Sequence, residues 1–246
     1  MTLDLWLLLP ILVSAYTIRG ITGFGSGLIA VPLLALSLPL TFVVPLILMT
    51  DFTASVTLGG LHRDKIAWHE IRRLLGPGLI GVLAGAWLLV SLPSTLMLMG
   101  LGSFILLYAL RNLLLDTTHP RIASSAWAWP AGLTGGAIGA MFGTGGPPYV
   151  IYLSHRLFDK GQLRATFSGL FFIEGLARIG SFTGNGLLLD TQLWWAYALA
   201  APVALAALWI GSHIHTHLTQ AQMLKLISLI LIGSGVSLWA KALTAI

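Results

Sequence analysis

The sequence of 246 residues contains no cysteine and few charged residues. Without cysteine the chain has no disulfides, no thiolate metal ligands and no cysteine nucleophile. Charged residues make up only 9% of the chain, whereas soluble domains are roughly one quarter charged. Apolar residues make up 57%, and the mean hydropathy is +0.90. These values argue against a soluble fold and indicate a protein that lies in a membrane.

Motifs of several catalytic classes are also missing. The sequence has no Walker phosphate-binding loop, and His69-Glu70 lacks the second histidine of the zinc-protease helix. No serine–histidine pair, paired aspartates or metal-ligand cluster points to catalysis, so we predict no enzyme activity and no cofactor. The formal net charge of +5 is not read as a sign of nucleic-acid binding, because the basic residues lie in short loops. There they act as orientation signals, and the predicted partner is the lipid bilayer.

Long apolar stretches recur along the whole chain, and most are long enough to cross a bilayer as a helix, which takes about 20 residues. They do not alternate apolar and polar residues as the strands of a transmembrane barrel do. We therefore predict an all-α polytopic membrane protein whose first helix is retained. The stretches lie near residues 4–38, 40–60, 74–91, 92–115, 122–153, 165–189, 192–212 and 222–240.

Each half of the chain contains a similar glycine-rich segment inside a long apolar stretch. The two segments are Phe24-Gly25-Ser26-Gly27 and Phe142-Gly143-Thr144-Gly145. Asp51 also aligns with Glu174, and Gly85 aligns more weakly with Gly211. An internal duplication explains these matches and is common in transporters. We place the two membrane repeats at residues 1–116 and 117–246, which together form one transport domain.

Basic residues concentrate in cytoplasmic loops, and this bias discriminates between two topologies. If 4–38 and 122–153 each cross the membrane once, seven basic residues lie inside and four outside. If each enters and leaves on the same side as a broken hairpin, only Lys241 lies outside. The inside set is then Arg63, Lys65, Arg72, Arg73, Arg111, Arg121, Arg156, Lys160, Arg164 and Lys225.

We predict the second topology, in which the two repeats are inverted. Each repeat is a broken, re-entrant helical hairpin plus three transmembrane helices, giving eight full-length segments, or ten helices when the arms are counted separately. The first arm, from Asp4 to Ile18, is predicted to be roughly 22 Å long, shorter than the roughly 30 Å hydrocarbon core. The glycine-rich tips are therefore expected within the membrane.

Residues 19–32 and 139–149 are predicted helix breaks, because glycine weakens a helix by up to about 1 kcal/mol relative to alanine and permits positive φ. Irregular backbone at membrane depth is tolerated only where protein or a watery cavity satisfies its polar groups, so we expect a cavity between the breaks. New half-helices are predicted to begin near Gly27 and Pro147, with N-termini that attract anions. Close helix packing is the alternative role of glycine, and we expect it at Gly81/Gly85, Gly132/Gly136 and Gly180/Gly184.

Four ionisable residues lie inside apolar stretches, where each costs at least about 2.5–3.5 kcal/mol and therefore faces a cavity or a partner. Asp51 and Glu174 are predicted to carry protons or to gate the pathway. Arg19 is predicted to hold an anion, with capping of carbonyls as the alternative. Arg178 follows Glu174 by one helical turn, so a structural ion pair and a direct role in transport both remain open. The predicted substrate-binding residues are Arg19, Gly23, Phe24, Gly25, Ser26, Gly27, Phe142, Gly143, Thr144, Gly145, Gly146 and Arg178.

The segments GITGFGSGLIAVPLL and GAIGAMFGTGGPPYVIYL resemble the duplicated signature of the TauE/SafE sulfite exporter family, also called TSUP, and the likeness extends over nearly the whole chain. Ser26 and Thr144 depart from the usual glycine-glycine-glycine tip, a difference that bears on the substrate. The resemblance implies a secondary transporter in the bacterial cytoplasmic membrane for a small anion such as sulfite, sulfoacetate or a related sulfonate. A passive anion channel is the alternative, protons are the candidate coupling ion, and the sequence leaves open whether the chain forms a homo-oligomer.

Overall fold

A computed structural model describes residues 5–23, 25–59, 63–114, 124–214 and 220–244. Within these ranges the chain forms ten α-helices and two short 3-10 helices, with no β-strand, so the predicted all-α fold is confirmed. The helices are α1 Leu5–Thr22, α2 Ser26–Ala35, α3 Leu40–Gly59, η1 Arg63–Lys65, α4 Trp68–Ser91, α5 Ser94–Leu114, η2 Ser125–Trp127, α6 Ala128–Phe142, α7 Gly146–Ser154, α8 Lys160–Gly184, α9 Thr191–His213 and α10 Gln220–Thr244.

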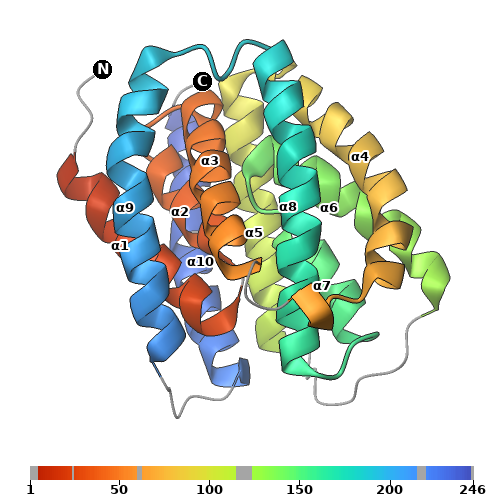
Figure 1. The fold of residues 1–246 in the computed structure, drawn as a ribbon. Helices are drawn as coiled ribbons and strands as arrows, with labels where there is room; N and C mark the ends of the chain where they lie inside the picture. The colour runs from red at the N-terminus through yellow and green to blue at the C-terminus, as the bar shows by residue number, and fades with distance from the viewer. Residues whose placement is uncertain (1–4, 24, 60–62, 115–123, 215–219, 245–246) are drawn as a thin grey trace.

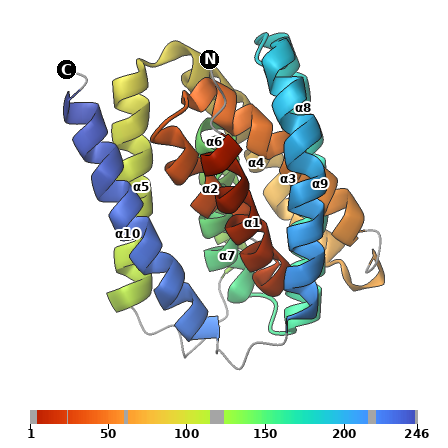
Figure 2. The ribbon, with the colours of Figure 1, turned by 90° about the vertical axis from the view of Figure 1, so that its left-hand side faces the viewer.

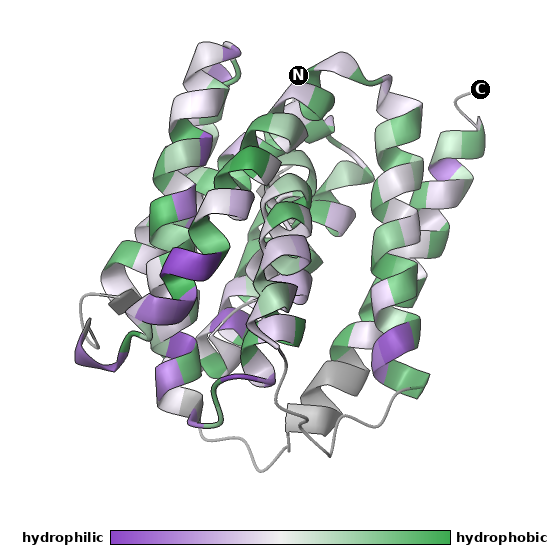
Figure 3. Cartoon of the chain, turned by 90° about the vertical axis from the view of Figure 1, so that its right-hand side faces the viewer, coloured by the Kyte–Doolittle hydropathy of each residue, from purple (hydrophilic) through white to green (hydrophobic). Residues whose placement is uncertain are grey.

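In the part of the chain that the structure describes, five helices, α3, α4, α5, α9 and α10, are long and apolar enough to cross a membrane. Helix α8 has 25 residues, but it is more polar because it carries several charged side chains, of which Glu174 and Arg178 are buried. Large apolar side chains such as Trp87, Leu107 and Trp209 are exposed on the outer surface. Figure 3 shows apolar residues along the helices and most polar residues gathered toward one end. This surface suits a bilayer.

Each half of the chain begins with two short helices that meet at a glycine turn. Residues 23–25 separate α1 from α2, and residues 143–145 separate α6 from α7. Both predicted breaks are confirmed, and α2 and α7 begin within one residue of the predicted starts. Positive φ angles explain why the turns need glycine: they occur at Gly23, Gly25 and Gly143.

The first arm is longer than predicted. Helix α1 contains 18 residues and continues to Thr22 rather than ending near Ile18. At helical rise it is roughly 27 Å long. Arg19 therefore lies in the last turn of α1 instead of at the break itself. The other arms, α2, α6 and α7, have 10, 15 and 9 residues and are too short to cross the roughly 30 Å core alone.

Helices from the two halves are interleaved. Helix α1 packs against α9 and α6 against α4, while α5 pairs with α10 and α3 with α8 (Figures 1 and 2). If each helix is exchanged for the one five places away in the other half, the α1–α9 and α4–α6 pairs turn into each other, and the α5–α10 and α3–α8 pairs map onto themselves. The pairing is what a duplication produces, although the inverted relation and the repeat boundaries stay predictions.

Glycines at the α4–α6 and α1–α9 crossings support the same correspondence. A β-carbon at Gly85 would lie 2.2 Å from the carbonyl oxygen of Ala137, and one at Gly211 would lie 2.1 Å from that of Thr17. The weakly aligned pair Gly85 and Gly211 therefore occupies equivalent crossings. Predicted packing is confirmed at Gly81/Gly85 and Gly132/Gly136, but it is wrong at Gly180/Gly184, where no described residue comes within 4 Å of an added β-carbon.

Helix α1 begins and α10 ends at the same end of the helix bundle, and the connection from α7 to α8 lies at the opposite end (Figures 1 and 2). Both topologies considered above require this arrangement. Its orientation in the membrane stays a prediction. Of the basic residues assigned to the inside, Arg121 lies outside the described residues.

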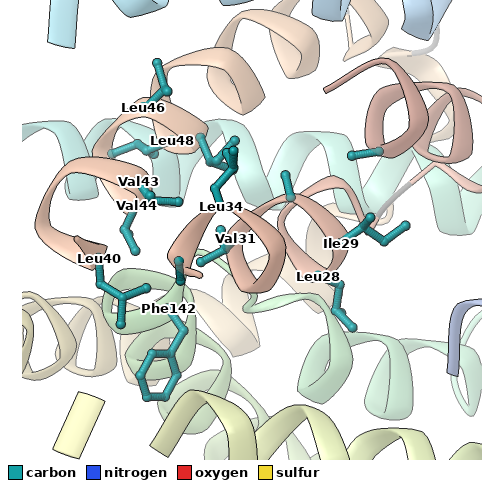
Figure 4. Packing of buried hydrophobic residues seen from close by; sticks show 14 of the residues in the cluster. Leu28, Ile29, Val31, Leu34, Leu40, Val43, Val44, Leu46, Leu48 and Phe142 are labelled. Carbon is teal, nitrogen blue, oxygen red and sulfur yellow. The ribbon is translucent and has the colours of Figure 1, made fainter. Parts of the chain in front are cut away.

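The main hydrophobic core surrounds α2, nearly all of whose residues are buried. Figure 4 shows Val31 and Leu34 of α2 near Val43 and Val44 of α3, with the ring of Phe142 close by. Because α2 is enclosed on all sides, its N-terminus is held at a fixed place inside the protein.

Candidate functional site

A small cavity lies where the two glycine turns meet. A β-carbon at Gly27 would lie only 2.0 Å from the carbonyl oxygen of Gly143, so the first turn of α2 touches the second break directly. The cavity has a volume of about 30 Å³. That is room for roughly two water molecules. Its walls come from both breaks and from α1, α3, α6 and α8: Arg19, Gly25, Ser26, Gly27, Leu28, Leu48, Asp51, Phe52, Ser55, Gly139, Gly143, Thr144, Gly145, Gly146, Phe171, Glu174 and Arg178.

The first half contributes an ion pair between a buried arginine, Arg19, and a partly buried aspartate, Asp51. Arg19 is 4% exposed, and its Nη1 donates to Asp51 Oδ1 at 2.5 Å. Its Nη2 donates to Ser55 Oγ at 2.8 Å and to the Asp51 carbonyl oxygen at 3.3 Å. The hydroxyls of Ser26 and Tyr16 each donate to the same Asp51 oxygen at 2.7 Å. Charge-assisted hydrogen bonds of this kind are strong, so the pair holds α1, α2 and α3 together.

The second half places its carboxylate and its arginine differently. Tyr149 on α7 donates its hydroxyl to Glu174, which is 3% exposed. Arg178 is 7% exposed, and its Nη1 donates to the carbonyl oxygen of Gly139 at 2.6 Å. Within the described residues, no ion-pair contact joins Glu174 to Arg178. The structural bridge that their spacing allowed is not formed here, and Arg178 binds the end of α6 instead.

In both halves an arginine connects the broken hairpin to the helix that carries the carboxylate, but the arginine lies on opposite sides of this contact. Ser55 and Arg178 each follow the aligned carboxylate by four residues. In the first half the arginine comes from the hairpin and reaches α3. In the second half it comes from α8 and reaches the hairpin. Each half therefore has one arginine that ties its broken hairpin to the helix carrying its carboxylate.

Three buried donors at the cavity have no hydrogen-bond partner in the described part of the chain: Arg19 Nε, Thr144 Oγ1 and Arg178 Nε. Buried polar groups are almost always paired, because an unpaired one costs about 1–3 kcal/mol. All three residues line the cavity, next to the N-termini of α2 and α7. The site is thus rich in donors that an acceptor-bearing ligand would satisfy.

Comparison with known proteins gives the family. The family model described as Sulfite exporter TauE/SafE matches residues 8–238. The chain belongs to this family. The resemblance inferred from the paired glycine segments is confirmed, and the chain is a multi-pass membrane protein of a transporter family.

Two curated relatives of this TauE/SafE chain have matching lengths. The probable inner membrane transporter protein TsaS of Comamonas testosteroni is 28% identical over 198 residues, which cover 78% of this chain and 81% of the relative. The probable sulfite/organosulfonate exporter TauE of Cupriavidus necator is 26% identical over 232 residues, covering 92% and 90%. No solved structure gives a significant match.

The structure brings most of the predicted site residues of this TauE/SafE chain to one place. Nine of the predicted substrate residues line the cavity together with Asp51 and Glu174. Gly23 instead lies against the side chain of Arg164, which caps the carbonyl oxygen of Gly20. The ring of Phe142 packs in the core near Gly100, away from the cavity lining. Phe24 lies outside the described residues.

Sequence reasoning missed Tyr16, Ser55 and Tyr149. Tyrosine and serine are common in apolar helices, and only the rotation of each helix shows which of them reach a buried carboxylate. The tyrosines sit on different hairpin arms, α1 and α7, so the internal repeat does not pair them either.

A second buried carboxylate cluster was also missed. Glu70, at the start of α4, is 1% exposed, and its Oε1 accepts from Arg156 Nη2 at 2.8 Å and from Arg73 at 3.1 Å. Its Oε2 accepts from the hydroxyl of Tyr152 at 2.6 Å. The hydrogen bond to Glu70 raises the pKa of Arg156, which therefore stays charged. This cluster ties α4 to the outer end of the second hairpin.

Proposed function

We propose that this chain is a secondary transporter that moves a small sulfur oxyanion or organosulfonate across the bacterial cytoplasmic membrane through the cavity between the two breaks. The observation that supports this proposal most strongly is that the N-termini of α2 and α7 and two arginines line the same cavity. The partial positive charge at a helix N-terminus attracts anions. The first turn of α2 also offers free N–H groups, whereas two of those in α7 are replaced by Pro147 and Pro148. The choice of a sulfur-containing substrate rests on the relatives, one of which is named a probable sulfite/organosulfonate exporter.

The size of the cavity favours a carrier over an open channel. Its volume of about 30 Å³ is smaller than the space that an anion with a sulfur atom and three oxygens needs. Passage therefore needs the surrounding helices to move, as in alternating access between two related halves. Such a movement would rearrange the hydrogen bonds that hydroxyl and arginine side chains form between each hairpin and the neighbouring helix.

Proton coupling or gating by the carboxylates belongs to this proposal. Asp51 and Glu174 both line the cavity, one from each half. Ionisable residues kept inside a membrane usually belong to an ion or proton pathway. Their contact with the proposed anion site supports a link between the substrate and protons.

The proposal is tested with purified protein in liposomes. Radiolabelled sulfite, methanesulfonate and sulfoacetate are each offered outside, with unlabelled anion inside, and counterflow is followed against protein-free liposomes. We expect at least one anion to show saturable counterflow. An absence of saturable flux across the whole panel, with correctly reconstituted protein, would remove the proposed function.

A further inference from the structure

The two arginines at the cavity are not equivalent, and this inequality bears on the charge of the substrate. Arg19 forms an ion pair with Asp51, in which Arg19 Nη1 lies 2.5 Å from Asp51 Oδ1. Two hydroxyls, from Ser26 and Tyr16, donate to that same carboxylate oxygen. The Asp51 carboxylate therefore has an arginine as its counter-ion and accepts charge-assisted hydrogen bonds from two further side chains. The charges of Arg19 and Asp51 are therefore paired with each other, although Arg19 Nε has no hydrogen-bond partner among the described residues.

Arg178 has no such partner among the described residues. Its contact is the neutral carbonyl oxygen of Gly139, and its Nε has no hydrogen-bond partner there. A β-carbon at Gly139 would lie 3.7 Å from Arg178 Nη1 and 3.4 Å from the α-carbon of Gly145, so the guanidinium lies beside the second break. Thr144, 2% exposed and with an unpartnered hydroxyl, belongs to that break. Two unused donors and the start of α7 therefore come together on one side of the cavity.

The other charged group of that side is Glu174. Tyr149 of α7 donates to it, Arg178 lies one turn away on the same helix, and α4 presents Gly78, where a β-carbon would meet Glu174 Oε1 at 2.5 Å. Across the cavity are Arg19 and Asp51. If Glu174 is ionised, the two positive and two negative charges of the cavity cancel. If it holds a proton, one positive charge remains.

Resting on the proposed function, we propose that Arg178 and Thr144 hold the substrate and that one proton on Glu174 matches the site to a monovalent anion. On loading, the carboxylate of Glu174 takes up one proton and becomes the neutral acid, while the anion binds beside Arg178. On release both leave on the same side, so one proton and one anion move together without net charge. Asp51 serves as the counter-ion of Arg19, which differs from the sequence prediction that gave both carboxylates one role.

Electrostatics explains the selectivity. An ion in a low-dielectric site without a compensating charge costs several kcal/mol. A monovalent anion with protonated Glu174 leaves the cavity neutral, whereas a dianion leaves it negative. The substrate class is therefore a compact sulfur oxyanion with a single negative charge, such as hydrogensulfite or a simple sulfonate.

The decisive experiment uses wild-type protein in liposomes and needs no variant. Radiolabelled methanesulfonate, with one charge at any neutral pH, is compared with sulfoacetate, which has two. We expect an imposed pH gradient to drive methanesulfonate accumulation, a potassium–valinomycin potential at equal pH to change it less than twofold, and sulfoacetate counterflow to be at least tenfold slower. Accumulation driven by the membrane potential, or equal counterflow of both anions, would overturn the inference and leave the proposed function standing. Absence of all saturable flux, sulfite included, would remove both.

Variants assign the roles. In Glu174→Gln the pH gradient should no longer drive methanesulfonate accumulation, and the residual counterflow should lose its pH dependence. Thr144→Val should raise the methanesulfonate concentration for half-maximal counterflow at least fivefold, and Thr144→Ser should restore it. If Glu174→Gln still accumulates methanesulfonate in a pH gradient, the proton site lies elsewhere and the inference is wrong.

Discussion

Charged side chains inside this protein differ in how many hydrogen bonds they make with neighbouring side chains, and that number separates structural charges from those available to a ligand. Asp51 and Glu70 each accept hydrogen bonds from at least one arginine and one tyrosine. Glu174 accepts from a tyrosine, and Arg178 keeps an Nε that no described residue pairs. The first two carboxylates are fixed by their surroundings, whereas the second pair retains capacity for a ligand.

The Glu70 cluster should be energetically coupled to the second hairpin. We expect a double-mutant cycle of Glu70→Ala and Arg156→Ala to give a coupling free energy of about 0.5–3 kcal/mol, because both side chains share one charge-assisted contact. Thermal unfolding of the purified protein in detergent measures it. Arg72→Ala, on the exposed face of α4, is the control and should show no coupling to Arg156→Ala. Additive effects of the Glu70 and Arg156 substitutions would show that the contact is not formed.

Close approach of backbone to backbone positions the half-helices. The N-terminal turn of α2 reaches the second break because Gly27 has no side chain. Lys241 of α10 donates to the carbonyl oxygens of Ala35 and Leu36 at 2.9 and 3.1 Å and so fixes the other end of α2. Both ends of this short helix are therefore determined by other parts of the chain.

Gly27→Ala should separate α2 from the second break. The added β-carbon would lie 2.0 Å from the Gly143 carbonyl oxygen, a backbone atom that cannot rotate away. Overpacking of this kind costs about 1–3 kcal/mol. We expect a lower melting temperature and at least tenfold slower sulfite counterflow. Gly76→Ala, where no described residue lies within 4 Å, should leave the melting temperature unchanged or higher.

The breaks can be predicted from sequence because glycine density and paired prolines are local signals. The starts of α2 and α7 agree with the prediction within one residue, and Asp51, Glu174 and both arginines are found because charge in an apolar run is conspicuous. The pairing of Arg19 with Asp51 was missed, since it depends on how α1 and α3 cross. Phe142 was assigned to the site by its place in the repeated motif, but the αL turn at Gly143 leaves its ring in the core.

The main helix–helix pairs of the molecule follow a two-fold pattern, but the environments of the corresponding helices α2 and α7 differ. Helix α2 contacts α10 and α5, so it is enclosed, whereas one side of α7 borders a groove lined by apolar residues of α6 and α7. The halves therefore differ in this conformation. Such inequality between two related halves is expected of a protein that alternates between two states.

The absence of cysteine makes the topology directly testable. Single cysteines are introduced by Phe158→Cys, between α7 and α8, and by Leu189→Cys, between α8 and α9; both side chains are exposed. In the re-entrant topology a membrane-impermeant maleimide should label Leu189→Cys in intact cells and Phe158→Cys only after permeabilisation. The single-crossing topology, in the orientation that its loop charges give, requires the reverse pattern, and observing that pattern would refute the predicted orientation of the second half.

The central claim, that an anion binds between the two breaks, is tested most directly by sulfite counterflow with Arg178→Gln and Arg72→Gln proteins in liposomes. Both variants remove one positive charge, but only Arg178 lines the cavity. We expect the rate of saturable sulfite counterflow to fall at least tenfold in Arg178→Gln and to stay at the wild-type value in Arg72→Gln. Wild-type rate and half-saturation in a correctly folded Arg178→Gln protein would contradict it.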